Sequence, residues 1–235
     1  MRLPGGHDHA SDRDAGDAAG GADAIDAGDA GTCGRPLDIV LSATTLLLTS
    51  PILIVAAIAI KINDGGPVLF TQRRVGRNCT PFTVYKLRTM VPDAEARLNE
   101  VLETLGNGRD NVLFKLDNDP RRTKVGRFLE ATSLDELPQL FNVLNGSMSI
   151  VGPRPALPEE VAKFDDELMD RFNVPPGVTG LWQVEARDNP SFSAYRRLDL
   201  FYVENWNLLL DLVLMMETCS SVAARVLRRG KKSRG

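Results

Sequence analysis

An uncharged apolar run in the N-terminal third of the chain constrains the fold more than any other feature. Residues 39–60 are 22 consecutive positions without a charged side chain. As an α-helix, with a rise of about 1.5 Å per residue, they would extend roughly 33 Å, enough to cross a hydrocarbon core of about 30 Å. The run therefore predicts a membrane-associated helix. A buried helix of a soluble protein is the less favoured alternative for a run of this length.

Two membrane topologies fit this helix because Ser50-Pro51 lies near its middle. Proline removes one backbone donor and kinks a helix, and the hydroxyls of Thr49 and Ser50 can satisfy the freed carbonyl groups. On these residues alone, a kinked helix that spans the bilayer is favoured over a helix that breaks at Ser50-Pro51 and returns to the same face. Arg35 and Lys61 flank the run, so positive charge does not strongly orient it.

The charge pattern describes an acidic tail, a mildly basic body and a strongly basic end. Residues 1–34 carry seven Asp and two Arg among Gly and Ala, a net charge of −5, whereas the whole chain of 235 residues has a net charge of −3. This tail is predicted to be disordered, and no ordinary signal peptide is expected because no apolar run lies near Met1. The three cysteines are widely spaced, which argues against a disulfide framework or a zinc site and favours a cytosol-facing location.

Short alternating patterns and helical patterns predict the secondary structure of the body. Residues 67–76 and 81–90 predict two strands joined by a hairpin turn. Helices are expected over residues 93–105, 136–145, 158–172 and 192–229. The predicted fold class is α+β and predominantly helical, with one small β-hairpin.

Two adjacent carboxylates, Asp135 and Glu136, begin the helix expected in "TSLDELPQLFNVLNG". Acidic residues are common at helix starts, because they meet the positive end of the helix dipole. Asp135 as N-cap, or a capping box of Ser133 and Glu136, would explain them without any chemistry. The same surroundings keep a carboxylate ionised, and an ionised, oriented carboxylate can ligate Mg²⁺ or attack phosphorus.

Several basic residues and one further acid are candidates for handling phosphate. Arg154 lies between two prolines in "VGPRP", and a guanidinium on a stiff turn suits phosphate oxygens. Lys86 and Arg88 alternate along a predicted strand, and Arg187 lies in a polar loop. Asp211 lies within the apolar run "LLLDLVLMM", where an acid needs a partner, so a facing cation or metal is one interpretation and the polar side of an interfacial helix is the other.

The combination of these segments resembles the bacterial sugar transferase family, the monotopic polyprenyl-phosphate phosphoglycosyl transferases. The similar segments are "SP" in the apolar run, "VLFTQRRVGRN", "FTVYKLRTM", "SLDELPQLFNVLNGSMSIVGPRP", "PPGVTGLWQV" and "LDLFYVENWNLLLDL". They occur in the family's order and cover roughly residues 35–229.

The resemblance implies transfer of a sugar 1-phosphate from a UDP-sugar to a polyprenyl (undecaprenyl) phosphate. Asp135 would attack the sugar-bearing phosphate, UMP would leave, and the lipid phosphate would displace the carboxylate. Glu136 would position or deprotonate the second nucleophile. Mg²⁺ would be the cofactor, with Asp135 and Asp211 as metal ligands. Lys86, Arg88, Arg154 and Arg187 would bind substrate phosphate, although Arg88 rests on strand alternation alone.

The resemblance also reverses the preference for a spanning helix. It implies a monotopic protein at the cytoplasmic face of the cell membrane, with a re-entrant helix broken at Ser50-Pro51 and interfacial amphipathic helices. The chain is then divided into a disordered acidic tail (1–34), a re-entrant membrane helix (35–62), a catalytic domain (63–229) and a basic C-terminal tail (230–235). Besides the two substrates, the partners expected are lipids of the cytoplasmic leaflet, with no nucleic acid and with a homo-oligomer left open.

One departure from the family's pattern lies just before the two acids. Glu130 and Ala131 stand in "LEATSLDEL" where relatives usually carry basic residues, so a phosphate or lipid contact is missing unless another cation replaces it. A non-catalytic membrane scaffold of a polysaccharide assembly system is therefore retained as an alternative function. The donor sugar stays open among glucose, galactose and N-acetylated amino sugars.

Overall fold

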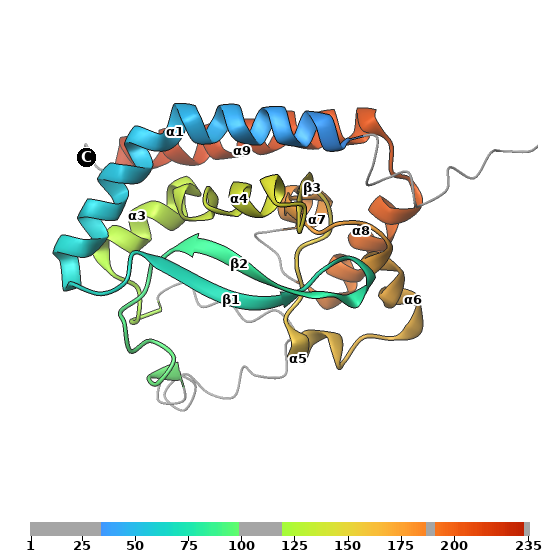
Figure 1. Ribbon diagram of the computed structural model, residues 1–235, viewed down its shortest axis with the longest axis horizontal. Helices are drawn as coiled ribbons and strands as arrows, with labels where there is room; N and C mark the ends of the chain where they lie inside the picture. The colour runs from blue at the N-terminus through green and yellow to red at the C-terminus, as the bar shows by residue number, and fades with distance from the viewer. Residues whose placement is uncertain (1–33, 99–118, 187–190, 233–235) are drawn as a thin grey trace, which may run out of the picture.

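The first element, α1, is a long helix that bends but remains a single helix. The structure, a computed structural model of the full chain, describes residues 34–98, 119–186 and 191–232. Helix α1 extends over Arg35–Asp64 and ends at Gly65, which adopts a left-handed conformation and donates its N–H to Lys61 O. Figure 1 shows the second part of α1 turning away from the first.

The bend in α1 has a specific chemical basis at Pro51. Pro51 cannot donate to the carbonyl of Leu47, four residues earlier, and the Ser50 hydroxyl donates to that carbonyl instead, at 2.8 Å. The Thr49 hydroxyl donates to Thr45 O at 2.7 Å. The break predicted at Ser50-Pro51 is therefore a bend in a continuous helix rather than an interruption.

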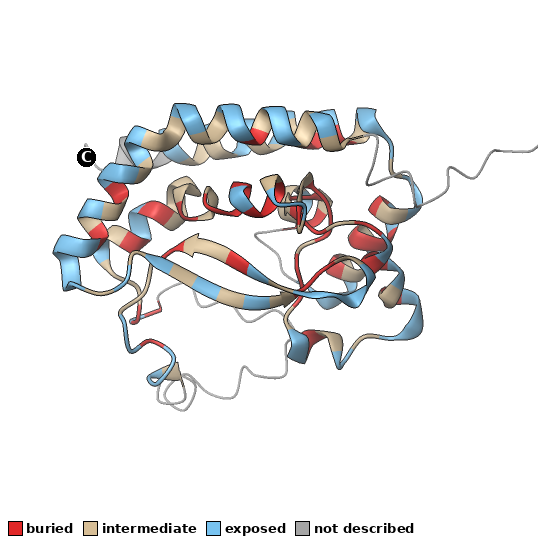
Figure 2. Ribbon diagram, in the orientation of Figure 1, coloured by how far each residue is buried: buried red, intermediate tan, exposed pale blue. Residues whose placement is uncertain are grey.

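Most of the large apolar side chains of α1 face outward. Among the described residues, α1 is the one helix long and apolar enough to cross a membrane, and 17% of its most apolar window is buried in the protein. Figure 2 shows the exposed faces of α1 and α9 on the same side of the molecule. The exposed large apolar residues of α1 are Ile39, Val40, Leu47, Leu48, Ile52, Ile54, Val55, Ile58 and Ile62.

The predicted antiparallel hairpin is present, and it is separated from α1 by other helices. Strands β1 (Leu69–Val75) and β2 (Pro81–Leu87) pair with Leu69 opposite Leu87 and Val75 opposite Pro81. They are joined through the short 3₁₀ turn η2 (Arg77–Cys79). Between the hairpin and α1 lies a helical layer made of α3 (Lys124–Thr132) and α4 (Gln139–Leu144) (Figure 1).

Two apolar clusters join these layers. In the first, Leu129 of α3 packs with Ala56 and Ile60 of α1 and Leu87 of β2. In the second, Leu140 and Val143 of α4 pack with Val84 of β2 and Met148. Helix α3 approaches the backbone so closely that a Cβ at Gly126 would lie 1.8 Å from Thr89 O, which explains a glycine inside this helix.

A second, parallel strand pair brings two glycine-proline segments together. Strand β3 (Ser149–Val151) pairs with β4 (Gly177–Thr179). Any side chain at Gly177 would collide with the backbone of Gly152, with a Cβ at 2.1 Å from Gly152 N. The "VGPRP" turn and the "PPGVTG" segment are thereby held against each other. The sequence patterns did not predict this pair.

The C-terminal half is more broken than the sequence predicted. The helix expected over residues 158–172 is instead α5 (Pro158–Val161), α6 (Asp166–Met169) and the 3₁₀ turn η5 (Asp170–Asn173). Asp165 starts α6 by accepting a hydrogen bond from Leu168 N. After α7 (Leu181–Glu185), the helix expected over residues 192–229 is divided into α8 (Phe192–Glu204) and α9 (Leu208–Lys232). Asn207 directly precedes α9 and caps it, because its side chain accepts a hydrogen bond from Leu210 N at 2.9 Å.

The described part of the chain is thus mostly helical with a small antiparallel hairpin, in agreement with the predicted fold class. The helix expected over residues 93–105 lies mainly outside the described residues, and residues 93–97 form turns.

Candidate active site

The two adjacent acids lie on a short turn between α3 and α4. This turn, η4 (Leu134–Glu136), is a 3₁₀ helix preceded by Ser133 in the left-handed conformation, with φ of 57°. Leu134 and Leu137, three residues apart, pack into the two apolar clusters on either side. The turn is therefore anchored at both ends, with Asp135 and Glu136 between the anchors.

The structure corrects both helix-capping interpretations of these acids. Helix α4 begins at Gln139 with Pro138 as its N-cap, so Asp135 does not cap it. The Ser133 side chain forms no capping hydrogen bond at the start of η4. The carboxylate of Asp135 belongs to a residue that is only 8% exposed, and Glu136 is half-buried. Conventional helix capping therefore does not explain this pair.

Lys86 lies beside the pair, as the sequence predicted. Its Nζ is 3.2 Å from Glu136 Oε1, and the two side chains are 32% and 30% exposed. Lys86 is on β2, 50 residues earlier in the chain, so the hairpin delivers a cation to the turn. In such an arrangement the Lys86 ammonium of β2 can bind a phosphate group, and a carboxylate of the anchored turn can attack its phosphorus.

Arg88, predicted to share the strand face of Lys86, lies elsewhere. Strand β2 ends at Leu87, so strand alternation does not extend to Arg88. Its guanidinium is buried, forms an ion pair with Asp64 at the end of α1, and donates to Pro67 O at 2.6 Å. This hydrogen bond with Arg88 lowers the pKa of the Asp64 carboxyl. Arg88 therefore secures the end of α1, and the structure does not support its assignment to phosphate binding.

Arg154 belongs to a separate cluster of buried charges. Its Nη1 lies 3.2 Å from both carboxylate oxygens of Glu160, and its backbone carbonyl accepts from Arg171 at 2.6 Å. Arg171 also pairs with Asp199 at 2.6 Å, and Arg74 lies 3.8 Å from Glu160. Burial lowers the pKa of Arg74 to about 10, so Arg74 stays charged at neutral pH. Three arginines thus face Glu160 and Asp199, and the Glu159 carboxylate also acts on Arg74, so the cluster holds charges of both signs.

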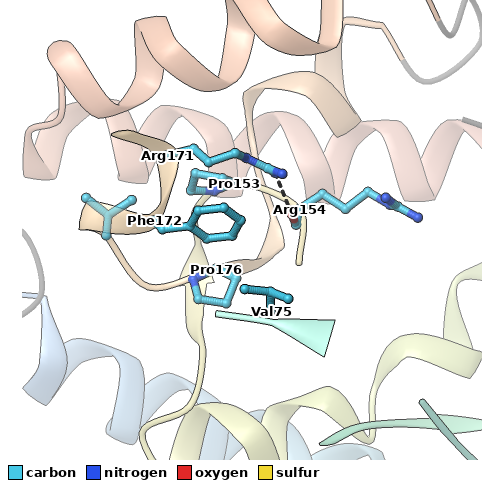
Figure 3. Close-up of a pocket in the computed structure, with 7 residues that line it drawn as sticks. Val75, Pro153, Arg154, Arg171, Phe172 and Pro176 are labelled. Carbon is cyan, nitrogen blue, oxygen red and sulfur yellow. Dashed lines mark hydrogen bonds between the residues drawn. The ribbon is translucent and has the colours of Figure 1, made fainter. Parts of the chain in front are cut away.

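A shallow hollow, too narrow to enclose a water molecule, lies at this cluster and is lined by Val75, Pro153, Arg154, Arg171, Phe172, Val174 and Pro176. Figure 3 shows that the Arg154 side chain extends away from Pro153 and Phe172 rather than between them. The Arg154 side chain is 26% exposed, which leaves it accessible to an anion outside the hollow.

Asp211 is a buried, hydrogen-bonded carboxylate. It is 8% exposed, and its two oxygens accept hydrogen bonds from Tyr202 Oη at 2.8 Å and Trp206 Nε1 at 3.1 Å. Burial raises the pKa of Asp211 to about 6. The sequence analysis expected this buried acid to have a polar partner, and the structure supplies two, the hydroxyl of Tyr202 and the indole N–H of Trp206.

The aromatic residues before α9 differ in exposure. Tyr202 is buried and donates inward, and Trp206 is half-buried. Phe201 is 49% exposed and remains available to a membrane surface.

The residues that fit Mg²⁺ are the two adjacent acids. In the described ranges no three His, Cys, Asp or Glu side chains group around a metal position. Proteins often hold Mg²⁺ with one or two carboxylates together with substrate phosphates, so Asp135 and Glu136 suffice for such a role without Asp211. Arg187 lies outside the described residues.

Two further contacts surround the turn. Glu130, the departure noted before the two acids, forms an ion pair with Arg122 at 2.9 Å. From α9, Arg225 Nη2 donates to Ser133 Oγ at 3.2 Å. Sequence reasoning did not find Arg225, because it lies 92 residues from Ser133 and no local pattern links the two residues.

Comparison with known proteins shows which family and which relatives this chain resembles. The family model described as bacterial sugar transferase matches residues 30–225. The undecaprenyl-phosphate galactose phosphotransferase of Salmonella typhimurium is 42% identical over 193 residues, which are 81% of this chain and 40% of the relative. The exopolysaccharide production protein ExoY of Rhizobium meliloti is 38% identical over 190 residues, 80% of this chain and 84% of the relative.

A third relative is the UDP-glucose:undecaprenyl-phosphate glucose-1-phosphate transferase of Klebsiella pneumoniae. It is 40% identical over 189 residues, which are 77% of this chain and 38% of the relative. The chain spans about two fifths of the length of several curated relatives that it matches, including an uncharacterized sugar transferase of Haemophilus influenzae of which it covers 41%.

Proposed function

The chain belongs to the bacterial sugar transferase family, and from this premise we propose that it is a phosphoglycosyl transferase. It would transfer sugar 1-phosphate from a UDP-sugar to a polyprenyl phosphate, giving a polyprenyl-diphosphate sugar and UMP. The names of its relatives include galactose and glucose phosphotransferases that use undecaprenyl phosphate. The observation that carries the proposal is the anchored η4 turn, which holds two adjacent carboxylates beside Lys86.

The first half of the reaction follows from the position of Asp135. One carboxylate oxygen attacks the phosphorus that bears the sugar, the bond from this phosphorus to the bridging oxygen breaks, and UMP leaves with that oxygen. An aspartyl phosphosugar remains on the protein. Lys86 lies where it can neutralise charge on the transferring phosphate. Mg²⁺ held by Asp135 and Glu136 would lower the charge of the diphosphate and help UMP to leave.

The second half returns Asp135 to its free form. A phosphate oxygen of the polyprenyl phosphate attacks the same phosphorus, and the Asp135 carboxylate leaves. Glu136 would orient this second nucleophile or accept its proton, because it adjoins Asp135 on the turn and contacts Lys86. Two displacements through one nucleophile give ping-pong kinetics.

A re-entrant α1 at the cytoplasmic face of the cell membrane is part of the proposal. Both ends of α1 are bonded to the same body of the protein. Arg35 donates to Val143 O and Leu144 O at the end of α4, and Asp64 pairs with Arg88 after β2. A helix that crossed the bilayer would carry its ends to opposite sides, which these contacts oppose. The bend at Pro51 and the exposed apolar side chains suit a helix that enters the bilayer and returns.

This arrangement would place the turn near the surface where a soluble UDP-sugar meets a membrane-embedded lipid phosphate. The exposed part of the Arg154 side chain supports Arg154 as a contact for substrate phosphate, and Arg187 is retained in the same role on the family resemblance. The product would enter exopolysaccharide, capsule or glycoconjugate synthesis at its first membrane step.

The proposal is tested by UMP release in detergent from UDP-glucose, UDP-galactose and UDP-N-acetylglucosamine, with undecaprenyl phosphate and Mg²⁺. We expect release with at least one sugar, loss of release in Asp135→Asn, and wild-type release in the matched variant Asp166→Asn, an exposed acid of α6. A folded wild-type protein that consumes none of these sugars would overturn the proposal in favour of a scaffold. An Asp135→Asn protein that still releases UMP would instead reject Asp135 as the nucleophile.

A further inference from the structure

A contact between the last helix and the catalytic turn has no role in the mechanism above. Arg225 of α9 is half-buried, and its Nη2 lies 3.2 Å from Ser133 Oγ. Because an arginine side chain only donates, Ser133 Oγ is the acceptor. Helices α3 and α9 pack against each other, so the contact is part of a larger interface.

Ser133 is the point at which the chain changes direction before Asp135. Its left-handed conformation, with φ of 57°, is strained for a residue other than glycine. Its N–H donates to Glu130 O at 3.2 Å, and its carbonyl accepts from Glu136 N at 3.3 Å. Ser133 therefore links the end of α3 to the backbone of the two acids. A side-chain contact that holds Ser133 also sets the direction in which the turn presents Asp135.

We propose that Arg225 is a positioning residue for the catalytic turn, acting through Ser133. Its guanidinium holds the Ser133 side chain, and thereby stabilises the left-handed conformation that directs the Asp135 carboxylate toward the phosphate site. The inference rests on the proposed function for its effect on rate, but the geometric effect on the turn is independent of any activity. It also gives the basic end of the chain a role other than contact with lipid.

The kinetic test is the single-turnover loading of phosphosugar onto the protein in detergent, without lipid acceptor. Arg225→Met removes the donor and keeps a helix-forming side chain. We expect the loading rate to fall by about tenfold to a hundredfold, since misplaced reacting groups cost factors of this size, with KM for the UDP-sugar unchanged within about twofold. Arg225→Lys, which can still donate to Ser133 Oγ, should recover part of the rate.

Coupling between the two side chains distinguishes this contact from a general effect of α9. Ser133→Ala should slow loading as Arg225→Met does, and the double variant should be no slower than the slower single variant. Arg73→Met, at an exposed position of β1, is the matched control for loss of one positive charge and should load at the wild-type rate. Multiplying effects in the double variant, or wild-type loading by Arg225→Met, would overturn the inference.

A second measurement does not depend on catalysis. Backbone hydrogen exchange of residues 133–137 should be at least about fivefold faster in Arg225→Met and in Ser133→Ala than in the wild type, with the melting temperature of each variant close to that of the wild type. Unchanged exchange at the turn would refute the positioning role even if the wild type transferred no sugar. If exchange at the turn is faster in the variants but the wild type transfers no sugar, the positioning role of Arg225 stands and only the proposed function is rejected.

Discussion

The pair of Lys86 and Glu136 offers a direct way to separate stability from chemistry. At 3.2 Å, two unit charges attract by roughly 1 kcal/mol in water and about 5 kcal/mol at an effective dielectric constant of about 20. Because the two side chains are 32% and 30% exposed, the pair lies toward the first limit. Measured pairs of this kind contribute about 0–1 kcal/mol to folding. Lys86→Met should therefore lower the free energy of unfolding by about 1 kcal/mol or less.

The expected effect of Lys86→Met on activity is much larger. If Lys86 neutralises charge that develops on the transferring phosphate, its removal should cost about a hundredfold to a thousandfold in kcat, as for other electrostatic donors of this kind. The assay pairs denaturant unfolding in detergent with UMP release at saturating UDP-sugar. A loss of activity that only matches a small loss of folded protein would refute a role for Lys86 in catalysis.

A charge swap provides the control for this experiment. Lys86→Glu combined with Glu136→Lys keeps an ion pair between β2 and the turn, so stability should return close to that of the wild type. Activity should stay low, because the cation has moved onto the turn and the carboxylate has moved to β2. Recovery of activity in the swapped protein would mean that the pair only supports the fold.

Three further outcomes follow from the structure. Gly126→Ala should destabilise the protein by about 2 kcal/mol in denaturant unfolding, because a Cβ 1.8 Å from Thr89 O costs more than the gain of about 1 kcal/mol in helix propensity, and a stabilised variant would contradict this packing. The pKa of Asp211, raised to about 6 by burial, makes the folded state bind more protons than the unfolded state between about pH 4 and 6, so this group's contribution to stability is lost as pH rises. The stability of the wild type relative to Asp211→Asn should accordingly fall by up to about 3 kcal/mol between pH 4 and pH 7, and a constant difference would exclude the shift. The topology of α1 can be tested in a cysteine-free background with single cysteines at Gly34 and Asn63. Both should react with an impermeant reagent from the same side of sealed vesicles, because both ends of α1 are bonded to the same body of the protein. Labelling from opposite sides would establish a spanning helix.

The parts of the fold that the sequence predicted are those set by local patterns. The length of α1 follows from its uncharged run, and the hairpin follows from two alternating segments around a turn. The missing donor at Pro51 also has a local effect, because the Ser50 hydroxyl bonds to the carbonyl that Pro51 leaves free.

The errors arose where contacts between distant segments decide the structure. Arg88 was assigned to phosphate because strand alternation was extended one residue too far, and no local pattern shows its pairing with Asp64, 24 residues away. Arg225 was missed for the same reason, across 92 residues.

Asp211 is a different case, because its partners are local. Tyr202 and Trp206 lie only nine and five residues away. An acid in an apolar run, with two aromatic donors shortly before it, could have predicted a buried hydrogen-bonded carboxylate in place of a metal ligand. The long helix predicted over residues 192–229 concealed this, since it left out the turn at Asn207 that brings the three side chains together.

The proposed mechanism depends on a covalent bond between Asp135 and the phosphosugar. This bond is tested by measuring the intact mass of the purified protein after incubation with Mg²⁺ and each UDP-sugar, without lipid acceptor. We expect the protein mass to increase by one phosphosugar with the correct donor. The increase should be absent in Asp135→Asn and should disappear when undecaprenyl phosphate is added. A wild-type protein that gains no mass with any donor, yet releases UMP once the lipid is supplied, would contradict the covalent mechanism and indicate direct transfer.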